Sequence, residues 1–207
     1  MREVVGKPAV ALAARSGWQA ALVELTDQTF EGDTLRAILT AATDDLRLRR
    51  CDLRGAHLRS ADFTDVTFEE CVLDNVDLRG ASLGGASFIG CRLMGADFED
   101  SRGFGFSITR CNAFAANLTG AVLARADLSG TRFTEAVLRG ADLRSCLFDG
   151  CDLSAADLTM ARLDGADLRG AGLGACDLDR LRALKGAIVT TEQAAEIVRD
   201  LTGATVL

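Results

Sequence analysis

The sequence predicts an all-β solenoid, and three regularities support this prediction. A five-residue pattern runs 27 times through residues 46–180 without an insertion or a deletion. Its central position, first occupied by Leu48, holds Leu, Phe or Ile at 25 of the 27 sites, and the position two residues earlier holds Ala or Cys at 21. A period of five fits neither an α-helix nor a flat strand, so the backbone must turn after each unit. Residues 46–180 are therefore expected to wind into the regular coils of a solenoid.

The other positions of the repeat suit the surface and corners of such a coil. The central position and the small residue two places before it lie on the same side of the chain, so both are expected to point inward. Asp or Asn recurs immediately before the central position, as at Asp52 and Asp62, and its side chain can accept hydrogen bonds from backbone amides of the turn. Glycine follows two residues after the central position in twelve repeats, where a corner favours it.

The repeat Ala-Asp-Leu-Arg at 141–144, preceded by Gly140, resembles the consensus A-(D/N)-L-x-x of the pentapeptide-repeat family. The resemblance covers about two thirds of the chain. It implies a right-handed quadrilateral β-helix with four pentapeptides per coil and coils about 4.8 Å apart. Because each coil contacts only its neighbours, both ends of such a solenoid need caps.

Residues 1–45 lack the in-phase repeat and are expected to form the N-terminal cap. Their Ala, Leu and Val residues at mixed spacing predict one or two short helices around 8–25, with Trp18 in the core of the cap. Phe30 and Leu35 indicate an out-of-phase first turn. A separate binding function for this segment is the alternative to a plain cap.

One stretch inside the repeat, residues 101–115, departs from the pattern. Gly103 and Ala113 underfill the interior, Phe106 stands where a small residue is usual, and Phe104 and Phe114 fall at outward positions. Either the chain shifts locally so that these rings fill the gap, or the rings form an exposed apolar patch of the kind that marks a contact site. Local repacking is the favoured expectation.

Residues 181–207 are expected to contain a helix over about 191–201. Thr190 and Gln193 form a T-x-x-Q capping box, and Gly203 follows the last turn. The apolar face of this helix must cover either the end of the coil or its own copy in a second subunit. Relatives that act on topoisomerases dimerise through a C-terminal helix, so the resemblance implies a homodimer through the face Ala194, Ile197, Val198 and Leu201.

The residues that carry enzyme chemistry are scarce. The chain has one His and no Tyr, no nucleophile elbow and no phosphate-binding loop, so we expect neither catalysis nor a cofactor. His57 stands at an outward position where Asp is usual. All seven cysteines occupy the small inward position, where a thiol packs as a weak hydrophobe, so no metal site is expected.

Charge is unevenly distributed along the repeat. Residues 46–60 carry five arginines against Asp52, a net charge of +4. Residues 61–100 carry nine carboxylates against two arginines, a net charge of −7, and residues 101–180 are near balance. The acidic residues are candidates for a partner-binding surface: Asp62, Asp65, Glu69, Glu70, Asp74, Asp77, Asp97, Glu99 and Asp100.

Two functions compete on this evidence. The chain resembles the mycobacterial fluoroquinolone-resistance and plasmid quinolone-resistance branch of the family, whose members mimic duplex DNA and bind DNA gyrase or topoisomerase IV. Its uninterrupted register is more similar to the mycobacterial protein than to the plasmid proteins, whose projecting loops are absent here. The resemblance therefore implies a DNA-mimicking topoisomerase partner that modulates the enzyme or protects it from poisons, for antibiotic resistance or self-immunity. The alternative is a structural or protein-interaction rod with an unrelated partner, in which acids are simply the polar exterior of a solenoid.

Composition excludes several other classes of protein. With 48% apolar residues and a net charge of −7, the chain is neither disordered nor suited to bind nucleic acid directly. No stretch approaches the apolar length of a membrane span. The segment 8–14 is short for a signal peptide and is followed by Arg15, so a cytoplasmic protein is expected.

Overall fold

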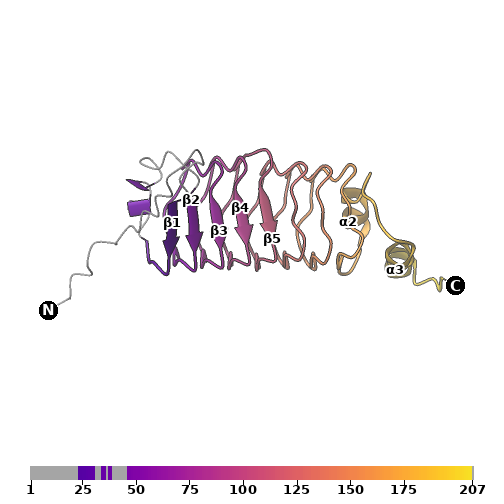
Figure 1. The fold of residues 1–207 in the computed structure, drawn as a ribbon. Helices are drawn as coiled ribbons and strands as arrows, with labels where there is room; N and C mark the ends of the chain where they lie inside the picture. The colour runs from indigo at the N-terminus through magenta and orange to yellow at the C-terminus, as the bar shows by residue number, and fades with distance from the viewer. Residues whose placement is uncertain (1–22, 31–33, 36, 39–45, 207) are drawn as a thin grey trace, which may run out of the picture.

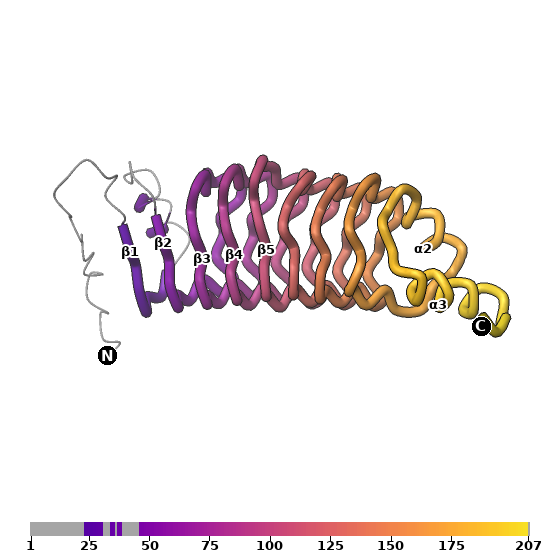
Figure 2. The backbone as a smooth tube through the Cα atoms, turned by 45° about the vertical axis from the view of Figure 1, so that its right-hand side comes forward, coloured from indigo at the N-terminus to yellow at the C-terminus, as the bar shows by residue number. Residues whose placement is uncertain are grey.

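The computed structural model describes residues 23–30, 34, 35, 37, 38 and 46–206, and it confirms the predicted β-solenoid. Five short strands form one parallel sheet in the order β1-β2-β3-β4-β5, and successive coils follow one another along a straight rod (Figures 1 and 2). The strands are β1 Val23–Thr26, β2 Leu46–Arg49, β3 Thr67–Glu69, β4 Ser87–Ile89 and β5 Ser107–Thr109.

The strand pairing defines four faces that repeat every twenty residues. The first face contains β1–β5 and continues through Asp127, Leu147, Asp167 and Ile188. The second face stacks Thr29, Asp52, Val72, Arg92, Asn112, Arg132, Asp152 and Gly172; the third stacks His57, Asp77, Asp97, Asn117, Val137 and Asp157; the fourth stacks Asp62, Ser82, Arg102, Val122, Asp142 and Arg162. Each repeat thus forms one side of a coil, and four repeats close it.

The interior is filled as the repeat predicts. Large side chains at the central position are buried from Leu48 through Leu173, and the aromatic ones stack between coils, with the Phe68 and Phe88 rings 4.8 Å apart. The seven cysteines are free and buried. Each of the Cys146 and Cys151 thiols donates to a carbonyl of the preceding coil, at 3.0 and 2.9 Å, and burial raises the pKa of both to about 12.

The corners require a left-handed backbone, which explains the glycines two residues after the central position. Gly120 has φ +65°, and a Cβ there would lie 2.7 Å from the carboxylate of Asp100 in the preceding coil. The Asp or Asn before the central position binds the turn as predicted. The carboxylate of Asp97, for example, accepts from the Glu99 amide at 3.1 Å.

The N-terminal prediction is tested only in part. Phe30 and Leu35 are buried in the core, so the out-of-phase first turn is confirmed. Val23–Thr26 is a strand rather than the end of a helix, because Leu25 pairs with Leu48 at the open end of the coil. The remainder of the expected helical region and Trp18 lie outside the described residues.

At residues 101–106 the interior of the coil is repacked, as expected. The ring of Phe104, which was expected to fill the space beside Gly103, does not take part. Phe106 is buried against Phe88, and Gly103 lies so close to the previous coil that a Cβ would meet the Leu83 carbonyl carbon at 2.4 Å. Phe104 is instead 74% exposed. The expectation of inward packing is wrong for Phe104, because Phe106 and the inward shift of the backbone already occupy the space.

At the C-terminal end, the coil stops earlier than the repeat predicts. Leu178 continues the repeat in sequence, but its side chain is 61% exposed. The reason is that Leu178 begins helix α2 Leu178–Ala183, which the repeat pattern does not predict. The chain then returns to the first face, where Ile188 pairs with Asp167. Helix α3 Thr191–Thr202 follows, with the predicted capping box and a left-handed Gly203.

Two side chains close this end of the rod by binding carbonyls that no further coil can satisfy. The Arg180 guanidinium donates to the carbonyls of Leu153, Leu173 and Ala156 at 3.1, 2.6 and 2.7 Å. The Gln193 amide donates to the carbonyls of Leu168 and Ala171, each at 2.8 Å. An exposed row of such groups is a template for further strands, so these contacts terminate the solenoid. None of the helices in the described part of the chain is long and apolar enough to span a membrane.

Candidate partner-binding surface

The nine candidate carboxylates do not form a single patch. Because the four faces recur every twenty residues, a stretch of forty residues visits each face twice. Asp74 is buried on the second face, Glu69 ends strand β3 on the first face, and Glu70 follows it at the corner. The others divide between the fourth face, with Asp62 and Asp65, and the third, with Asp77, Asp97, Glu99 and Asp100.

Several of these acids are neutralised by arginines. Asp77 accepts from Arg79 at 2.6 Å and lies 3.4 Å from Arg59, and the hydrogen bond from Arg79 holds the pKa of Asp77 well below its usual range. The carboxylate of Asp97 lies 3.4 Å from Arg79. The remaining pairs are Glu69 with Arg49 and Asp74 with Arg92.

The basic band of residues 46–60 is largely paired as well. Arg50 binds Asp27 at 2.8 Å and Arg54 binds Asp52 at 2.5 Å, while Arg49 and Arg59 reach the acids of the next coil. The charge asymmetry in the sequence is therefore weaker on the surface than along the chain.

Five of the nine candidate carboxylates make no ion pair with a described residue. Of these, Glu70 lies at the end of the first face, whereas the other four lie on the adjoining third and fourth faces. We call these four the acidic edge: Asp62, Asp65, Glu99 and Asp100. Asp62, Asp65 and Asp100 are exposed and Glu99 is half-buried. Asp62 also accepts from the Thr64 hydroxyl at 2.6 Å and from the Thr64 amide at 3.0 Å, which lowers its pKa.

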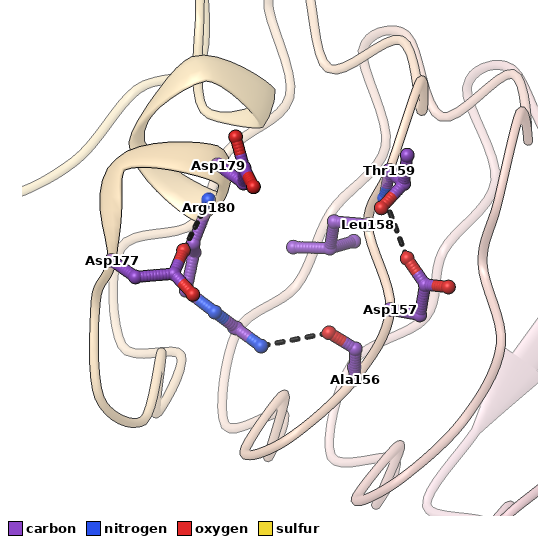
Figure 3. A pocket seen from close by; sticks show the side chains of 7 residues that line it. All are labelled: Ala156, Asp157, Leu158, Thr159, Asp177, Asp179 and Arg180. Atoms are coloured by element: carbon purple, nitrogen blue, oxygen red, sulfur yellow. Dashed lines mark hydrogen bonds between the residues drawn. The ribbon is translucent and has the colours of Figure 1, made fainter.

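The cavities of the described rod carry no constellation of catalytic groups. One of about 240 Å³ lies between α2 and the neighbouring coil (Figure 3). Its polar groups serve the helix and the end cap, since Asp177 accepts from the Arg180 amide at 2.8 Å and Arg180 binds the coil carbonyls. Another, of about 450 Å³, lies on the first face beside Leu147 and Asp149. Among the described residues, no group of three or more His, Cys, Asp or Glu side chains is arranged to hold a metal ion.

The residues expected to form a dimer interface divide into two sets. Ile197 packs against the core of its own rod and Leu201 is half-buried, whereas Ala194 and Val198 are exposed. The α3 helix therefore caps its own coil with one part of its apolar face and leaves the rest open. Other exposed apolar side chains at the same end are Leu178, Leu181, Ile188 and Val206.

Comparisons with solved structures find similar rods. The trypsin-treated M102R form of QnrB1, "a plasmid-mediated fluoroquinolone resistance protein", superimposes with a TM-score of 0.65 at 22% identity, covering 89% of this chain and 98% of QnrB1. Full-length QnrB1 gives 0.63 at 20% identity, covering 86% and 96%. HetL, a pentapeptide repeat protein involved in heterocyst differentiation regulation in Nostoc sp. strain PCC 7120, gives 0.45 at 24% identity, covering 85% and 88%. At these identities the likeness to QnrB1 establishes the fold alone.

Comparisons of sequence point to the same family. No curated protein matches the chain. Two family models do, both described as pentapeptide repeats: one matches residues 43–102, and the other matches 111–150 and 146–180. Together they span more than half of the chain, so the protein belongs to the pentapeptide repeat family.

Proposed function

We propose that this protein binds a type II topoisomerase, DNA gyrase or topoisomerase IV, as a mimic of duplex DNA, and thereby modulates the enzyme or protects it from poisons. The observation that carries the proposal is the match of the whole rod to QnrB1, a plasmid-mediated fluoroquinolone resistance protein. The protein acts without catalysis in this proposal, by occupying the DNA-binding surface of its partner.

The acidic edge supplies the charge that such mimicry needs. Asp62 and Asp100 belong to coils two levels apart, which corresponds to about 10 Å along the rod. Duplex DNA carries about six charges over that length. The four unpaired carboxylates supply four of these six charges, whereas Asp77 and Asp97 beside them on the third face are paired with arginines. The contact surface is thus the junction of the third and fourth faces in the N-terminal half of the rod.

A homodimer is part of this proposal, with the C-terminal ends of two rods joined. The exposed Ala194 and Val198 would meet their counterparts across a two-fold axis, and Leu181 and Ile188 would extend the apolar contact. Joining the rods end to end would double the length of the mimic and leave both acidic edges free.

The experiment is a gyrase supercoiling and cleavage assay, with and without a fluoroquinolone, in which the purified protein is titrated. We expect an effect at micromolar protein that weakens steeply as salt rises, because exposed charges are screened. The triple variant Asp62→Asn, Glu99→Gln and Asp100→Asn should lose most of the effect. Its matched control, Asp127→Asn, Asp149→Asn and Asp164→Asn, removes three unpaired carboxylates elsewhere on the rod and should lose little.

The alternative function is an interaction rod with an unrelated partner. It is favoured by one observation: the Asp before the central position binds its own turn, as Asp97 does, so many of the acids serve the fold. The alternative replaces the mimicry proposal if the wild-type protein has no effect on gyrase or topoisomerase IV at low salt, or if the two triple variants affect the enzyme equally.

A further inference from the structure

The repeat at 101–105 departs from the pattern at positions that matter for stability. The Ser101 hydroxyl oxygen is buried and has no hydrogen-bond partner among the described residues. Gly103 replaces a large core side chain, and Phe104 is 74% exposed. An unsatisfied buried hydroxyl and an exposed phenyl ring both destabilise a folded chain or promote association. Such local violations are characteristic of functional positions. The fourth face therefore has a feature that the solenoid itself does not need.

The residues that flank Phe104 on the fourth face have small side chains or none. Directly before it in the stack, at the equivalent position one coil earlier, lies Gly84, where an added Cβ would meet nothing within 4 Å. Gly85 and Gly105 occupy the adjoining corner, and Ala124 follows Phe104 one coil later. The fourth face thus presents one exposed ring beside a position that has no side chain, offset by a single coil, or about 4.8 Å.

We propose that this surface binds a second copy of the same chain, with the two rods antiparallel and their fourth faces in contact. We call it the Phe104 face; it comprises the outward positions of repeats 61–65, 81–85, 101–105 and 121–125. The two copies are related by a two-fold axis that runs parallel to the strands and lies between the coil of Gly84 and the coil of Phe104. This axis reverses the order of the coils, and it places each position of the repeat opposite the same position of a repeat in the other copy. Each Phe104 ring then lies over the bare backbone of Gly84 in the other copy, as an isologous contact requires.

The same axis brings opposite charges together. It exchanges the first and fourth repeats of the face, so Asp65 of one copy lies opposite Arg125 of the other, because both occupy the corner position of their repeats. Both side chains are exposed and neither makes an ion pair with a described residue. The axis also places Arg102 opposite Ser82, so no like charges meet. Shape and charge are therefore complementary in one and the same register.

The contact is small, since it spans about four coils of one face. Interfaces of this size are typical of transient complexes, so we expect association at chain concentrations of about 10 μM to 1 mM rather than a permanent dimer. The charges at the rim set the register and the antiparallel orientation, and the Phe104 ring supplies the apolar contact.

Sedimentation velocity over that concentration range tests the proposal. The experiment uses full-length chain carrying Val198→Asp, which removes any association through α3. Phe104→Ser should raise the dissociation constant at least about tenfold. Gly84→Val should do the same, because a Cβ at this position meets nothing within 4 Å in its own rod, while the side chain projects where the partner ring would lie. Met160→Ser, a control at a side chain that is 81% exposed in a regular repeat, should leave association unchanged.

A charge exchange tests the predicted register. Asp65→Arg alone and Arg125→Asp alone should each abolish association, because each places like charges opposite one another. An equimolar mixture of the two variants should associate again, and so should the double variant. Both changes are compatible with the fold, since each residue type already occupies this left-handed corner in the chain, with φ values of 60° and 67°.

Three results would overturn the proposal: a chain that stays monomeric throughout the range, association that Phe104→Ser leaves intact, or single charge variants that are not rescued by mixing. The proposal does not rest on topoisomerase binding, but the two surfaces overlap, because Asp62 and Asp65 of the acidic edge belong to the Phe104 face. Association is therefore measured without enzyme, and gyrase is assayed at chain concentrations below the dissociation constant of the self-association. A chain that associates through the Phe104 face but ignores gyrase would refute only the proposed function, and the reverse result would refute only this inference.

Discussion

Replacing Leu143 by alanine and, separately, Leu178 by alanine distinguishes the structure from the repeat pattern alone. The two leucines occupy the same position of the repeat, so the pattern predicts equal losses. In the structure Leu143 is fully buried within the rod, whereas Leu178 is mostly exposed on α2. Leu143→Ala should therefore lower the free energy of unfolding by about 2–5 kcal/mol, because coils above and below prevent the site from collapsing. Leu178→Ala should lower it by less than about 0.5 kcal/mol.

Urea denaturation followed by circular dichroism measures both effects. For a chain of this size, the Leu143→Ala loss corresponds to a fall in melting temperature of about 5–15 °C. Denaturant slopes must be compared as well, because solenoids can unfold in sections rather than in one transition. Equal losses for the two variants would mean that the coil continues through Leu178, and an unchanged midpoint for Leu143→Ala would refute its inward placement.

Three further predictions concern the ends of the rod and its charges. Val198→Asp should convert a dimer to a monomer in light scattering, with unchanged melting temperature; a dimer in both proteins would exclude α3 from the interface. Arg180→Ala should destabilise the chain by about 1–3 kcal/mol in urea, because three carbonyls lose their donor, whereas Arg182→Ala, which removes only an exposed pair with Asp179, should cost little. The hydrogen bonds from Thr159 and Arg139 lower the pKa of Asp157 to about 2, below its unfolded value of about 3.9; its contribution to stability is therefore present above pH 4 and is lost as the pH falls toward 2. Asp157→Asn should make the acid side of the stability profile shallower, and an unchanged profile would show that the carboxylate is not stabilised by folding.

The fold could be predicted because the repeat encodes it redundantly. A single position such as Leu48 carries little information, but 27 copies in one phase leave no other secondary structure possible. The capping box at Thr190 could also be predicted from the sequence, because it depends on hydrogen bonds between residues that are close in the chain. Helix α2 could not be predicted from the repeat, because Leu178 still occupies the central position with the expected residue type. A helix is more favourable there only because no further coil follows to cover a strand.

The candidate site was harder to predict because charge clustered in sequence is dispersed by the coil. Asp62 and Asp74 are twelve residues apart, yet they lie on different faces. Asp77 and Asp97 are twenty apart and lie side by side. Ion pairs between coils, such as Arg59 with Asp77, then cancel part of the charge. Grouping residues by their remainder after division by twenty would have revealed the faces, but not the pairing.

Because each face recurs every twenty residues, the length of a deletion decides whether the residues that follow it stay on the same face of the rod. Deleting one pentapeptide, for example 121–125, would preserve the inward and outward alternation but would rotate everything that follows by a quarter turn. Asp142, which now follows Val122 on the fourth face, would then move to the third face. Deleting twenty residues would instead shorten the rod by one coil, about 4.8 Å, and leave every remaining face aligned. Length and surface pattern can thus change independently: whole coils alter only the reach of the molecule, and partial coils alter which side chains a partner meets.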